Sequence, residues 1–460
     1  RGIPKVADYA KIFKAYDVRG VVPDELDEGV AEAVGAAFAT MTGAPAVAIV
    51  HDMRTSSGPL AAAFARGATS AGSDVVDGGL GSTDMLYYAS GSLGIPGAML
   101  TASHNPAKYN GIKLCRAGAK PVGQDTGLAE LRDLASNGVH AAAVTPGKVQ
   151  RKDLLSGYAD YLKTLVDLSG IRPLKVVVDA GNGMAGHTVP RVFDGLPIET
   201  VPMYFELDGS FPNHEANPID PANLADLQRA VISSSADIGL AFDGDADRCF
   251  VVDERGEIVS PSVLTALIAV RELKREPGAT VIYNLITSRA VPEIVAEHGG
   301  VAVRTRVGHS FIKAVMSDRG AIFGGEHSGH FYFRDFWFAD SGMLAALHVL
   351  AALGGQDKPL SELLGRYARY VASGEINSEV SDQALATARV RKAFSGRPEV
   401  SFDELDGLTV SGPQWWFNLR PSNTEPLLRL NVEAEDDTTL AKVTDEVLHI
   451  VRDATTLENR

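Results

Sequence analysis

Short runs of β-branched and other apolar residues alternate with helical patterns along most of this chain. Residues 47–50 and 97–100 are apolar runs of strand length, and the Ala-rich stretch 60–71 has the pattern of a helix. The second run leads directly into a polar loop at residues 101–106. An alternation of this kind predicts parallel strands joined by helical crossovers.

The same order of elements returns twice further along the chain. The expected second unit has strands at 175–179 and 237–242 and a helix at 223–234, and the third has strands at 281–285, 301–305 and 321–323 and helices at 288–297 and 311–318. Polar loops follow at residues 243–248 and 325–330. Because open α/β sheets bind ligands at the carboxyl ends of their strands, we expect the three loops to converge on one cleft.

From about Pro359 the pattern changes to that of a smaller α+β unit. Helices are expected at 360–367, 384–394 and 440–451, with strands at 415–419 and 427–432. The length of 460 residues corresponds to roughly three domains of ordinary size. The pattern itself predicts three similar α/β domains with mixed sheets, at 1–150, 151–255 and 256–365, and a smaller α+β C-terminal domain at 366–460, around one central cleft.

Composition and charge exclude several classes of protein. Apolar residues make up 45% of the chain and charged residues 22%, as in a folded globular protein. A net charge of −15 without a basic run argues against nucleic acid and anionic membranes as partners. Apolar stretches are shorter than the roughly 20 residues of a membrane span, and the first residues lack the apolar core of a secretory signal. With only Cys115 and Cys249 present, we expect a reducing, cytoplasmic location.

Three aspartates at alternate positions form a candidate metal site. Asp243, Asp245 and Asp247 follow an expected strand, and a tight loop would aim their carboxylates at one hard cation such as Mg²⁺. An isolated acidic turn is the simpler interpretation of such a run. The spacing to Glu254 also matches a calcium-binding EF-hand, but Arg248 stands where that loop needs Gly, and an apolar strand follows in place of a helix.

A glycine-rich stretch offers a different function. Gly181, Gly183 and Gly186 have the Gly-x-Gly-x-x-Gly spacing of a dinucleotide-binding turn, with Glu206 about 20 residues further on, so an NAD-dependent oxidoreductase is an alternative. A tight turn between strand and helix is the interpretation that we prefer, because the motif is weak alone and an acid, Asp179, stands just before the glycines.

Two further loops carry chemistry suited to a phosphorylated sugar. Ser103 follows an apolar strand, beside His104 and with Lys113 downstream, so its hydroxyl is a candidate for group transfer assisted by proton movement. The Glu326 carboxylate and the Ser328 hydroxyl suit vicinal sugar hydroxyls.

A loop near the end of the chain suits a phosphate group. The stretch from residue 420 to residue 426 combines one guanidinium, hydroxyl groups and turn N–H groups, contributed by Arg420, Ser422, Asn423 and Thr424. A polar turn is the simpler interpretation when the stretch is considered alone.

Taken in order, these four loops resemble those of the α-D-phosphohexomutase family, and the resemblance spans the whole chain. The opening residues Phe13-Lys-Ala-Tyr-Asp-Val-Arg-Gly20 also match the first motif of its bacterial phosphomannomutase/phosphoglucomutase members. The resemblance implies that hexose 6-phosphate and hexose 1-phosphate are interconverted through a phosphoserine at Ser103 and a hexose 1,6-bisphosphate intermediate.

The resemblance also implies a role for each candidate residue. A magnesium ion would be bound by Asp243, Asp245, Asp247 and a phosphoserine oxygen of Ser103; Glu326 and Ser328 would bind the sugar, Arg420, Ser422, Asn423 and Thr424 the distal phosphate, and the cleft would be lined by Tyr16, Arg19, His104, Lys113, Arg248, His309 and His330.

Sugar preference rests on a few positions. Related bispecific mutases often have Lys where this chain has Ile286, so that contact is either absent or supplied by Arg289 or Arg306. Phosphoglucosamine mutase is the alternative within the family, and its members usually have Ser and Gly where this chain has Thr101 and Asn423. The sequence therefore favours mannose and glucose phosphates as substrates, and is compatible with a monomer or a homodimer.

Overall fold

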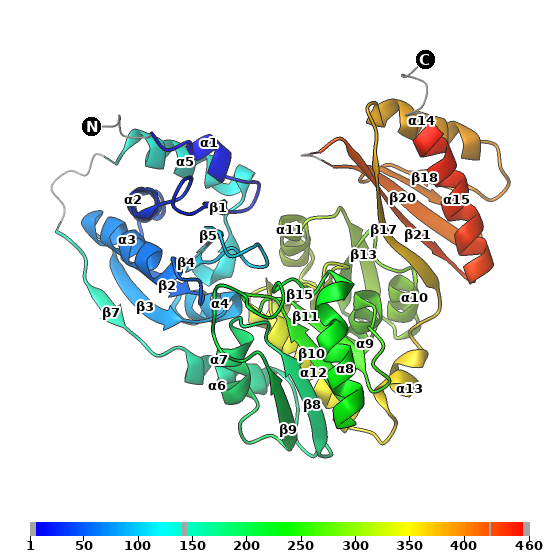
Figure 1. The fold of residues 1–460 in the computed structure, drawn as a ribbon, viewed down its shortest axis with the longest axis horizontal. Helices are drawn as coiled ribbons and strands as arrows, with labels where there is room; N and C mark the ends of the chain where they lie inside the picture. The colour runs from blue at the N-terminus through cyan, green and yellow to red at the C-terminus, as the bar shows by residue number, and fades with distance from the viewer. Residues whose placement is uncertain (1–5, 140–144, 423–424, 454–460) are drawn as a thin grey trace.

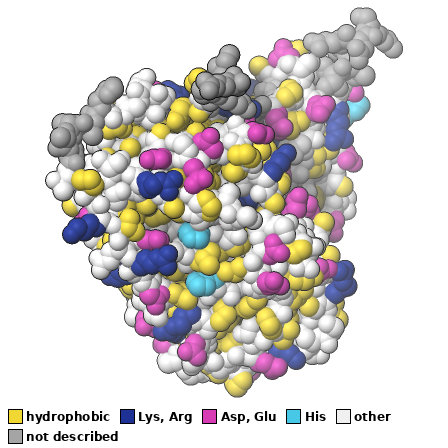
Figure 2. Space-filling view, turned by 60° about the vertical axis from the view of Figure 1, so that its left-hand side comes forward, with side chains coloured by type: hydrophobic (Ala, Val, Ile, Leu, Met, Phe, Trp, Pro, Cys, Tyr) yellow, Lys and Arg dark blue, Asp and Glu magenta, His cyan; other side chains and the backbone are white. Residues whose placement is uncertain are grey.

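Four β-sheets follow one another along the described part of the chain. The computed structural model describes residues 6–139, 145–422 and 425–453. In Figure 1 the first sheet lies on the left and the fourth on the right, with the second and third between and below them. Figure 2 shows acidic and basic side chains interspersed over one face of the molecule.

The first sheet is mixed. Its strand order is β1 (Val18–Val21), β5 (Tyr109–Arg116), β4 (Gly97–Leu100), β2 (Ala46–His51), β3 (Asp74–Leu80) and β7 (Val149–Arg151), with β6 (Lys120–Pro121) paired to β5. The central strands β4, β2 and β3 are parallel, whereas β5 runs antiparallel to β4 and β1. Its helices are α1 (Tyr9–Ile12), α2 (Glu28–Thr42), α3 (Ser57–Ser70), α4 (Thr83–Leu93) and α5 (Leu128–Asn137).

The second and third sheets repeat this arrangement with fewer strands. The second has the order β11 (Cys249–Asp253), β10 (Ile238–Phe242), β8 (Leu174–Asp179) and β9 (Ile198–Met203), with helices α6 (Leu155–Leu165), α7 (Ala185–Val192) and α8 (Ala225–Ser234).

The third has the order β13 (Val301–Thr305), β12 (Thr280–Asn284), β14 (Phe323–Gly325), β15 (Phe331–Phe333) and β16 (Ala339–Asp340), with helices α9 (Pro261–Arg275), α10 (Ala290–Glu297), α11 (His309–Arg319), α12 (Gly342–Gly354) and α13 (Leu360–Gly365). The parallel strands are extended by antiparallel pairing, through β11 in the second sheet and through β15 and β16 in the third.

The fourth sheet is wholly antiparallel. Its order is β17 (Val371–Glu379), β21 (Leu427–Ala434), β20 (Trp415–Pro421), β19 (Leu408–Ser411) and β18 (Ser401–Asp403), and it carries the helices α14 (Gln383–Phe394) and α15 (Asp437–Asp453). The predicted fold, three α/β units with mixed sheets followed by a smaller α+β unit, is confirmed. No helix of the described residues is long and apolar enough to cross a membrane.

The apolar cores show which units are joined most firmly. One buried cluster runs from the first sheet through the second to the third, from Ala48 to Tyr367, whereas the fourth unit has a separate cluster from Val380 to Val451. Because removing apolar surface from water is the main stabilising contribution in folding, the first three units form one body to which the fourth is attached.

Asp84, in the first turn of α4, links the first three units by hydrogen bonds. Its carboxylate accepts from the neighbouring Ser82 hydroxyl, from the Tyr158 hydroxyl on α6 at 2.6 Å and from the Ser341 hydroxyl before α12 at 2.7 Å. Burial raises the pKa of this carboxyl to about 7, against the opposing effect of the three hydroxyl groups. Ionisation of the Asp84 carboxyl therefore changes hydrogen bonds to the first, second and third units together.

We expect the Asp84 carboxyl to make the protein less stable as the pH rises. Because its folded-state pKa is raised, its contribution is complete below the unfolded value of about 4 and is lost as the pH rises through about 7. Relative to the parent, Asp84→Asn should gain up to about 1.4 kcal/mol of unfolding free energy per pH unit across this window. Urea unfolding at several pH values measures the difference.

The matched control for this experiment is Asp133→Asn, which changes an exposed carboxyl on α5. Its stability should follow the pH in parallel with that of the parent. Identical pH dependence of the parent and Asp84→Asn would contradict the expected role of Asp84.

Candidate active site

Ser103 lies in a tight loop at the carboxyl end of β4. Its backbone is in the left-handed region, at φ 53°, and its side chain is buried. The Ser103 hydroxyl donates to Asp243 Oδ2 at 3.2 Å and lies 3.3 Å from His104 Nδ1, while the Ser103 N–H donates to Thr101 Oγ1 at 2.9 Å. The loops predicted to carry the phosphoryl group and the metal are therefore in contact.

Arg54, which the sequence analysis did not identify, holds the serine loop in place. Arg54 as a whole is 3% exposed. Its guanidinium pairs with Asp52 at 3.3 Å and donates to four backbone carbonyls at 2.7 to 3.1 Å, those of Ser103, Asn105, Pro106 and Tyr109. Asp52 in turn accepts from Thr101 Oγ1 at 2.6 Å. The position of Ser103 thus depends on a buried ion pair at the end of the neighbouring strand β2.

The three predicted metal ligands lie together in the turn between β10 and β11. Asp243, Asp245 and Asp247 are buried, and one carboxylate oxygen of each lies within 4.8 Å of the others. Among the described residues, Oδ1 of Asp245 and Oδ1 of Asp247 are buried without a hydrogen-bond partner. Buried carboxylate oxygens without donors suit a hard divalent cation, so these residues fit a metal site.

Side-chain cations offset part of the negative charge in this turn. Lys113 Nζ on β5 lies 2.6 Å from Asp245 Oδ2 and 2.9 Å from Asp247 Oδ2, and Arg248 Nε lies 3.0 Å from Asp243 Oδ2. Burial, followed by the charges of Asp247 and Asp245, raises the pKa of Asp243. Burial acts in the same direction on Asp247, but Lys113 holds the pKa of that carboxyl below its usual range.

The EF-hand interpretation of this turn is wrong. The aspartates lie in a hairpin between two paired strands, and the side chain of Glu254 faces away to accept the N–H of Ser361 at 2.6 Å. The turn between β10 and β11 has no flanking helices of the EF-hand kind.

The dinucleotide-binding interpretation of the glycine-rich turn is also wrong. The N–H groups of Gly181, Gly183 and Gly186 already donate within the turn, to Asp179 Oδ1, the Ala180 carbonyl and the Gly183 carbonyl. A Cβ on Gly183 would lie 2.7 Å from the Gly244 carbonyl of the metal loop. This turn therefore packs against the metal loop, and its amides are unavailable to a pyrophosphate.

Hydrogen bonds between side chains hold the predicted sugar loop in one arrangement. Glu326 is buried and accepts a hydrogen bond from the Tyr332 hydroxyl. The Ser328 hydroxyl lies 2.8 Å from His330 Nδ1 and 3.3 Å from Glu326 Oε2. These residues surround the ends of β14 and β15, so a short hairpin fixes their relative positions.

Most of the predicted site residues line one cavity of about 200 Å³. It is lined from the first unit by Tyr16, Arg19, Ser103, His104 and Lys113, from the second by Asp247 and Arg248, and from the third by His309, Lys313 and His330. Burial, followed by the charge of Arg248, lowers the pKa of His104 to about 3, and burial with the charge of Lys313 lowers that of His309 to about 3. Both imidazoles are therefore neutral at pH 7.

The predicted phosphate loop lies apart from this cavity. Arg420 is at the end of β20, and its Nη1 is buried without a hydrogen-bond partner among the described residues. Asn423 and Thr424 lie outside the described residues. The Ser422 N–H donates to the Leu427 carbonyl at 2.8 Å, which closes the turn between β20 and β21.

Neither arginine suggested as a replacement for the missing lysine at Ile286 occupies the cavity. The Arg289 guanidinium donates to the Trp415 carbonyl at 3.0 Å, and that of Arg306 lies over the Phe311 ring at 4.7 Å. Ile286 lines a different cavity near the fourth unit.

Comparison with known proteins identifies the class of enzyme to which this fold and cavity belong. Models of the phosphoglucomutase/phosphomannomutase alpha/beta/alpha domains I, II and III match residues 10–138, 156–256 and 260–370, and the model of the C-terminal domain matches 375–450. The chain belongs to the phosphoglucomutase/phosphomannomutase family. It is therefore a phosphohexomutase, an isomerase of carbohydrate metabolism in a metal-dependent family.

Individual relatives resemble the chain over nearly its whole length. The phosphomannomutase of Escherichia coli K12 is 40% identical and the phosphohexose mutase of Xanthomonas campestris is 41% identical, with 95% and 96% of this chain covered and 97% and 99% of theirs. A phosphoglucomutase/phosphomannomutase family protein from Burkholderia thailandensis has a solved structure with a TM-score of 0.88, 34% identity and coverage of 97% of this chain and 98% of that one.

We predict that Arg54→Lys lowers both stability and mutase activity. A lysine cannot reproduce the four guanidinium hydrogen bonds to the serine loop, and damage to a buried charge pair costs about 3 kcal/mol. Thermal unfolding and kcat/KM measure the two effects.

Arg66→Lys is the matched control, because Arg66 makes only long ion pairs on the exposed face of α3. It should behave like the parent. An Arg54→Lys variant with unchanged unfolding and turnover would show that the serine loop does not depend on this guanidinium.

Proposed function

We propose that this phosphohexomutase interconverts the 6-phosphate and 1-phosphate of mannose, glucose or both through a phosphoserine at Ser103 and a hexose 1,6-bisphosphate intermediate. The contact between the Ser103 hydroxyl and Asp243, in a cavity lined by Lys113 and Arg248, is the observation that carries the proposal. Phosphoryl transfer depends mainly on positioning and neutralisation of charge, which this arrangement supplies.

The reaction would need two transfers. In the first, the phosphoryl group passes from Ser103 Oγ to the free hydroxyl of a hexose phosphate; that hydroxyl loses its proton to a nearby base, and the released Ser103 Oγ takes up a proton. The bisphosphate then turns around, and Ser103 Oγ loses its proton and receives the phosphoryl group from the other end, where the released sugar oxygen is protonated. The bisphosphate is thus both intermediate and activator. His104, His309 and His330, together with Lys113, are the proposed groups for proton movement in the cavity.

We propose that the bound metal is Mg²⁺ and that Asp243, Asp245 and Asp247 hold it together with an oxygen on Ser103. The unpartnered oxygens of Asp245 and Asp247 support this assignment. When bound, the ion would supply positive charge against the transferring phosphoryl group. Arg248 holds Asp243 by its Nε and approaches His104 Nδ1 at 2.6 Å with its Nη2, so it would orient both groups.

The remaining residues would grip the substrate. Glu326 and Ser328 would bind the sugar hydroxyls. Tyr16 and Arg19 would line the part of the cavity formed by the first unit. The Arg19 guanidinium is oriented by hydrogen bonds to Asn105 Oδ1 and Asp17 Oδ2, both at 2.5 Å. The distal phosphate would be bound by Arg420, Ser422, Asn423 and Thr424. Desolvation lowers the pKa of Arg420, and its unpartnered Nη1 is suited to an anion.

The domain division at 1–150, 151–255, 256–365 and 366–460 is also a proposal, as are a cytoplasmic location and a monomeric or homodimeric state. The two buried, unpaired cysteines Cys115 and Cys249 support a reducing compartment.

We expect Ser103→Ala to lose nearly all mutase activity while remaining folded. The Ser103 hydroxyl is buried and donates to Asp243, so its loss should cost about 1–3 kcal/mol, which is less than the total stability of an ordinary domain. Assays should use mannose, glucose and glucosamine 1-phosphates with catalytic hexose bisphosphate, and intact-mass spectrometry should find one phosphate on the parent and none on Ser103→Ala. Normal turnover of the variant would rule out the phosphoserine, and preference for glucosamine 1-phosphate would favour the phosphoglucosamine mutase alternative.

We expect removal of the metal to stop turnover with little effect on thermal unfolding. The hairpin of β10 and β11 is held by its own ladder of backbone pairs, so the turn does not need an ion to fold. Chelation followed by titration with Mg²⁺ or Ca²⁺ measures the recovery, and Mg²⁺ should be the more effective ion.

Glu254→Gln is the control for the metal experiment, because Glu254 is directed toward Ser361 rather than toward the aspartates. Its metal requirement should equal that of the parent. Equal reactivation by Ca²⁺ and Mg²⁺, or unfolding on chelation, would refute the magnesium assignment.

A further inference from the structure

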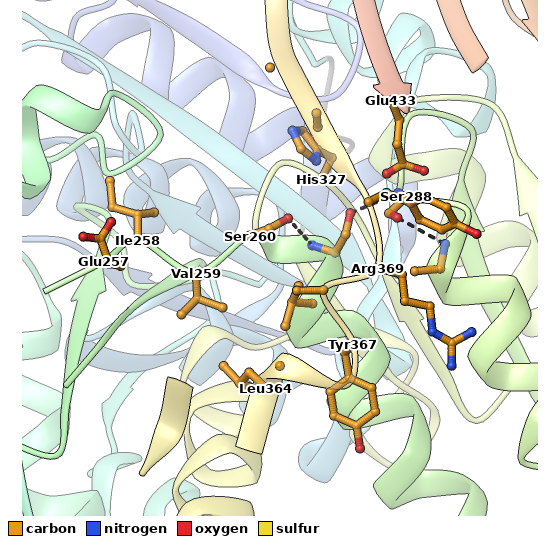
Figure 3. A pocket seen from close by; sticks show the side chains of 18 of the residues that line it. Glu257, Ile258, Val259, Ser260, Ser288, His327, Leu364, Tyr367, Arg369 and Glu433 are labelled. Carbon is orange, nitrogen blue, oxygen red and sulfur yellow. Dashed lines mark hydrogen bonds between the residues drawn. The ribbon is translucent and has the colours of Figure 1, made fainter. Parts of the chain in front are cut away.

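A second and larger cavity lies where the second, third and fourth units meet. Its volume is about 460 Å³, within the range of small-molecule sites, and it shares no lining residue with the cavity around Ser103 among the described residues. Figure 3 shows side chains from several elements around it, including Val259, Ser288, His327, Leu364 and Glu433.

We call this cavity the hinge cavity, because it lies between the third and fourth units. One part of its wall carries the hydroxyls of Ser260, Ser262 and Ser288. Ser260 Oγ accepts the Ser262 N–H at 3.2 Å, Ser262 Oγ accepts the Ser288 N–H at 3.1 Å, and Ser288 Oγ accepts the Ala290 N–H at 3.1 Å (Figure 3). Each hydroxyl is used as an acceptor of a backbone N–H, so its O–H group is available to donate to a ligand.

Other parts of the wall of the hinge cavity are apolar and aromatic. They include Leu364, Tyr367, Tyr370 and Trp416. Aromatic rings of this kind supply a large contact area for a flat ring. The cavity therefore offers hydroxyl groups to one part of a ligand and ring faces to another.

Two polar atoms in the wall have no partner among the described residues. Asn431 is 6% exposed, and its side-chain Nδ2 makes no hydrogen bond with the described residues. Nδ1 of His327 is likewise buried without a hydrogen-bond partner among them. Burial lowers the pKa of His327, so its ring is neutral at pH 7. A buried polar group without a partner destabilises the folded chain, and a ligand that bonds with it would remove that cost.

The charges around the hinge cavity disfavour an anion. The Arg255 guanidinium pairs with Asp253 at 3.1 Å, and that of Arg369 pairs with Glu297 at 2.6 Å. Glu257 and Glu433 add negative charge to the same walls. Because both arginines are already paired, a phosphate would meet net negative charge, so hexose phosphates are poor ligands here.

We propose that the hinge cavity is a binding site for an uncharged small molecule that combines a flat ring with hydroxyl and carbonyl groups, the chemistry of a nucleoside. Its ring would lie against Tyr367 and Trp416, its hydroxyls against the serines, and its acceptors against Asn431. The inference does not depend on the phosphoserine mechanism.

Occupancy of the hinge cavity would act on the mutase through two connections. His327 stands between Glu326 and Ser328, so a ligand on one side of this loop restrains the residues on the other. Glu433 Oε1 accepts both the Arg289 N–H at 2.9 Å and the Trp416 indole N–H at 2.8 Å, which joins the third unit to the fourth. A bound molecule would therefore restrict movement of the fourth unit.

The test uses the full chain with adenosine, guanosine, cytidine and uridine as probes, and with adenosine monophosphate as the charged comparison. We expect calorimetry to give a dissociation constant below about 1 mM for at least one nucleoside, and at least tenfold weaker binding of the monophosphate. Asn431→Leu should weaken the nucleoside about tenfold, as expected for one lost hydrogen bond. Saturating nucleoside should change kcat/KM of the parent.

Two further variants make the result decisive. Ala368→Trp alters an exposed lining residue, so the chain should fold normally and lose nucleoside binding because the ring fills the cavity. Asn377→Leu makes the same change as Asn431→Leu at an exposed position of the neighbouring strand β17 and should bind like the parent. Absence of binding by all four nucleosides, equal binding of the monophosphate, or undiminished binding by Ala368→Trp would overturn the proposal.

Discussion

Three carboxylates buried side by side are the constraint on which the rest of this structure depends. Asp243, Asp245 and Asp247 repel one another in a region from which water is largely excluded, so positive charge and hydrogen-bond donors must come from elsewhere. The first unit supplies them through Lys113 and through the Thr83 hydroxyl, which donates to Asp245 Oδ2 at 2.6 Å. The same requirement that stabilises the turn therefore brings two units together around Ser103.

The contact between the first and second units depends on the close approach of their backbones at the serine loop and the metal loop. A Cβ on Gly244 would lie 2.4 Å from the Ser103 carbonyl, and one on Gly183 would lie 2.7 Å from the Gly244 carbonyl, so three turns are stacked with no space for side chains. This explains why a glycine spacing typical of dinucleotide-binding proteins occurs here without that function. Gly183 must be small because the metal loop packs directly against it, and this contact is visible only in the folded structure.

The predicted strands lie close to observed ones because apolar runs are local patterns, whereas long-range contacts were predicted poorly. The expected strand at 415–419 lies within β20, whereas β17 was missed because its interspersed Ser, Gly and Glu residues leave no apolar run. The expected strand at 321–323 is shifted to Phe323–Gly325. The role of Arg54 was not foreseeable, since its partners are backbone carbonyls about 50 residues away and carry no side-chain signature.

Attachment of the fourth unit follows a different principle from that of the first three. The first three share a continuous apolar core, but several contacts of the fourth with the third are polar, such as Arg304 with Asp403 at 2.5 Å and the Val307 N–H with Asp406 at 3.1 Å. Polar interfaces of this kind permit domain movement, because exchange of their hydrogen bonds with water costs little. Arg420 lies on the fourth unit, whereas Ser103 and the aspartates lie on the body formed by the first three. In the reaction that we propose, this division would keep the charged centre fixed and leave the group that binds the distal phosphate adjustable, as a substrate held in two orientations requires.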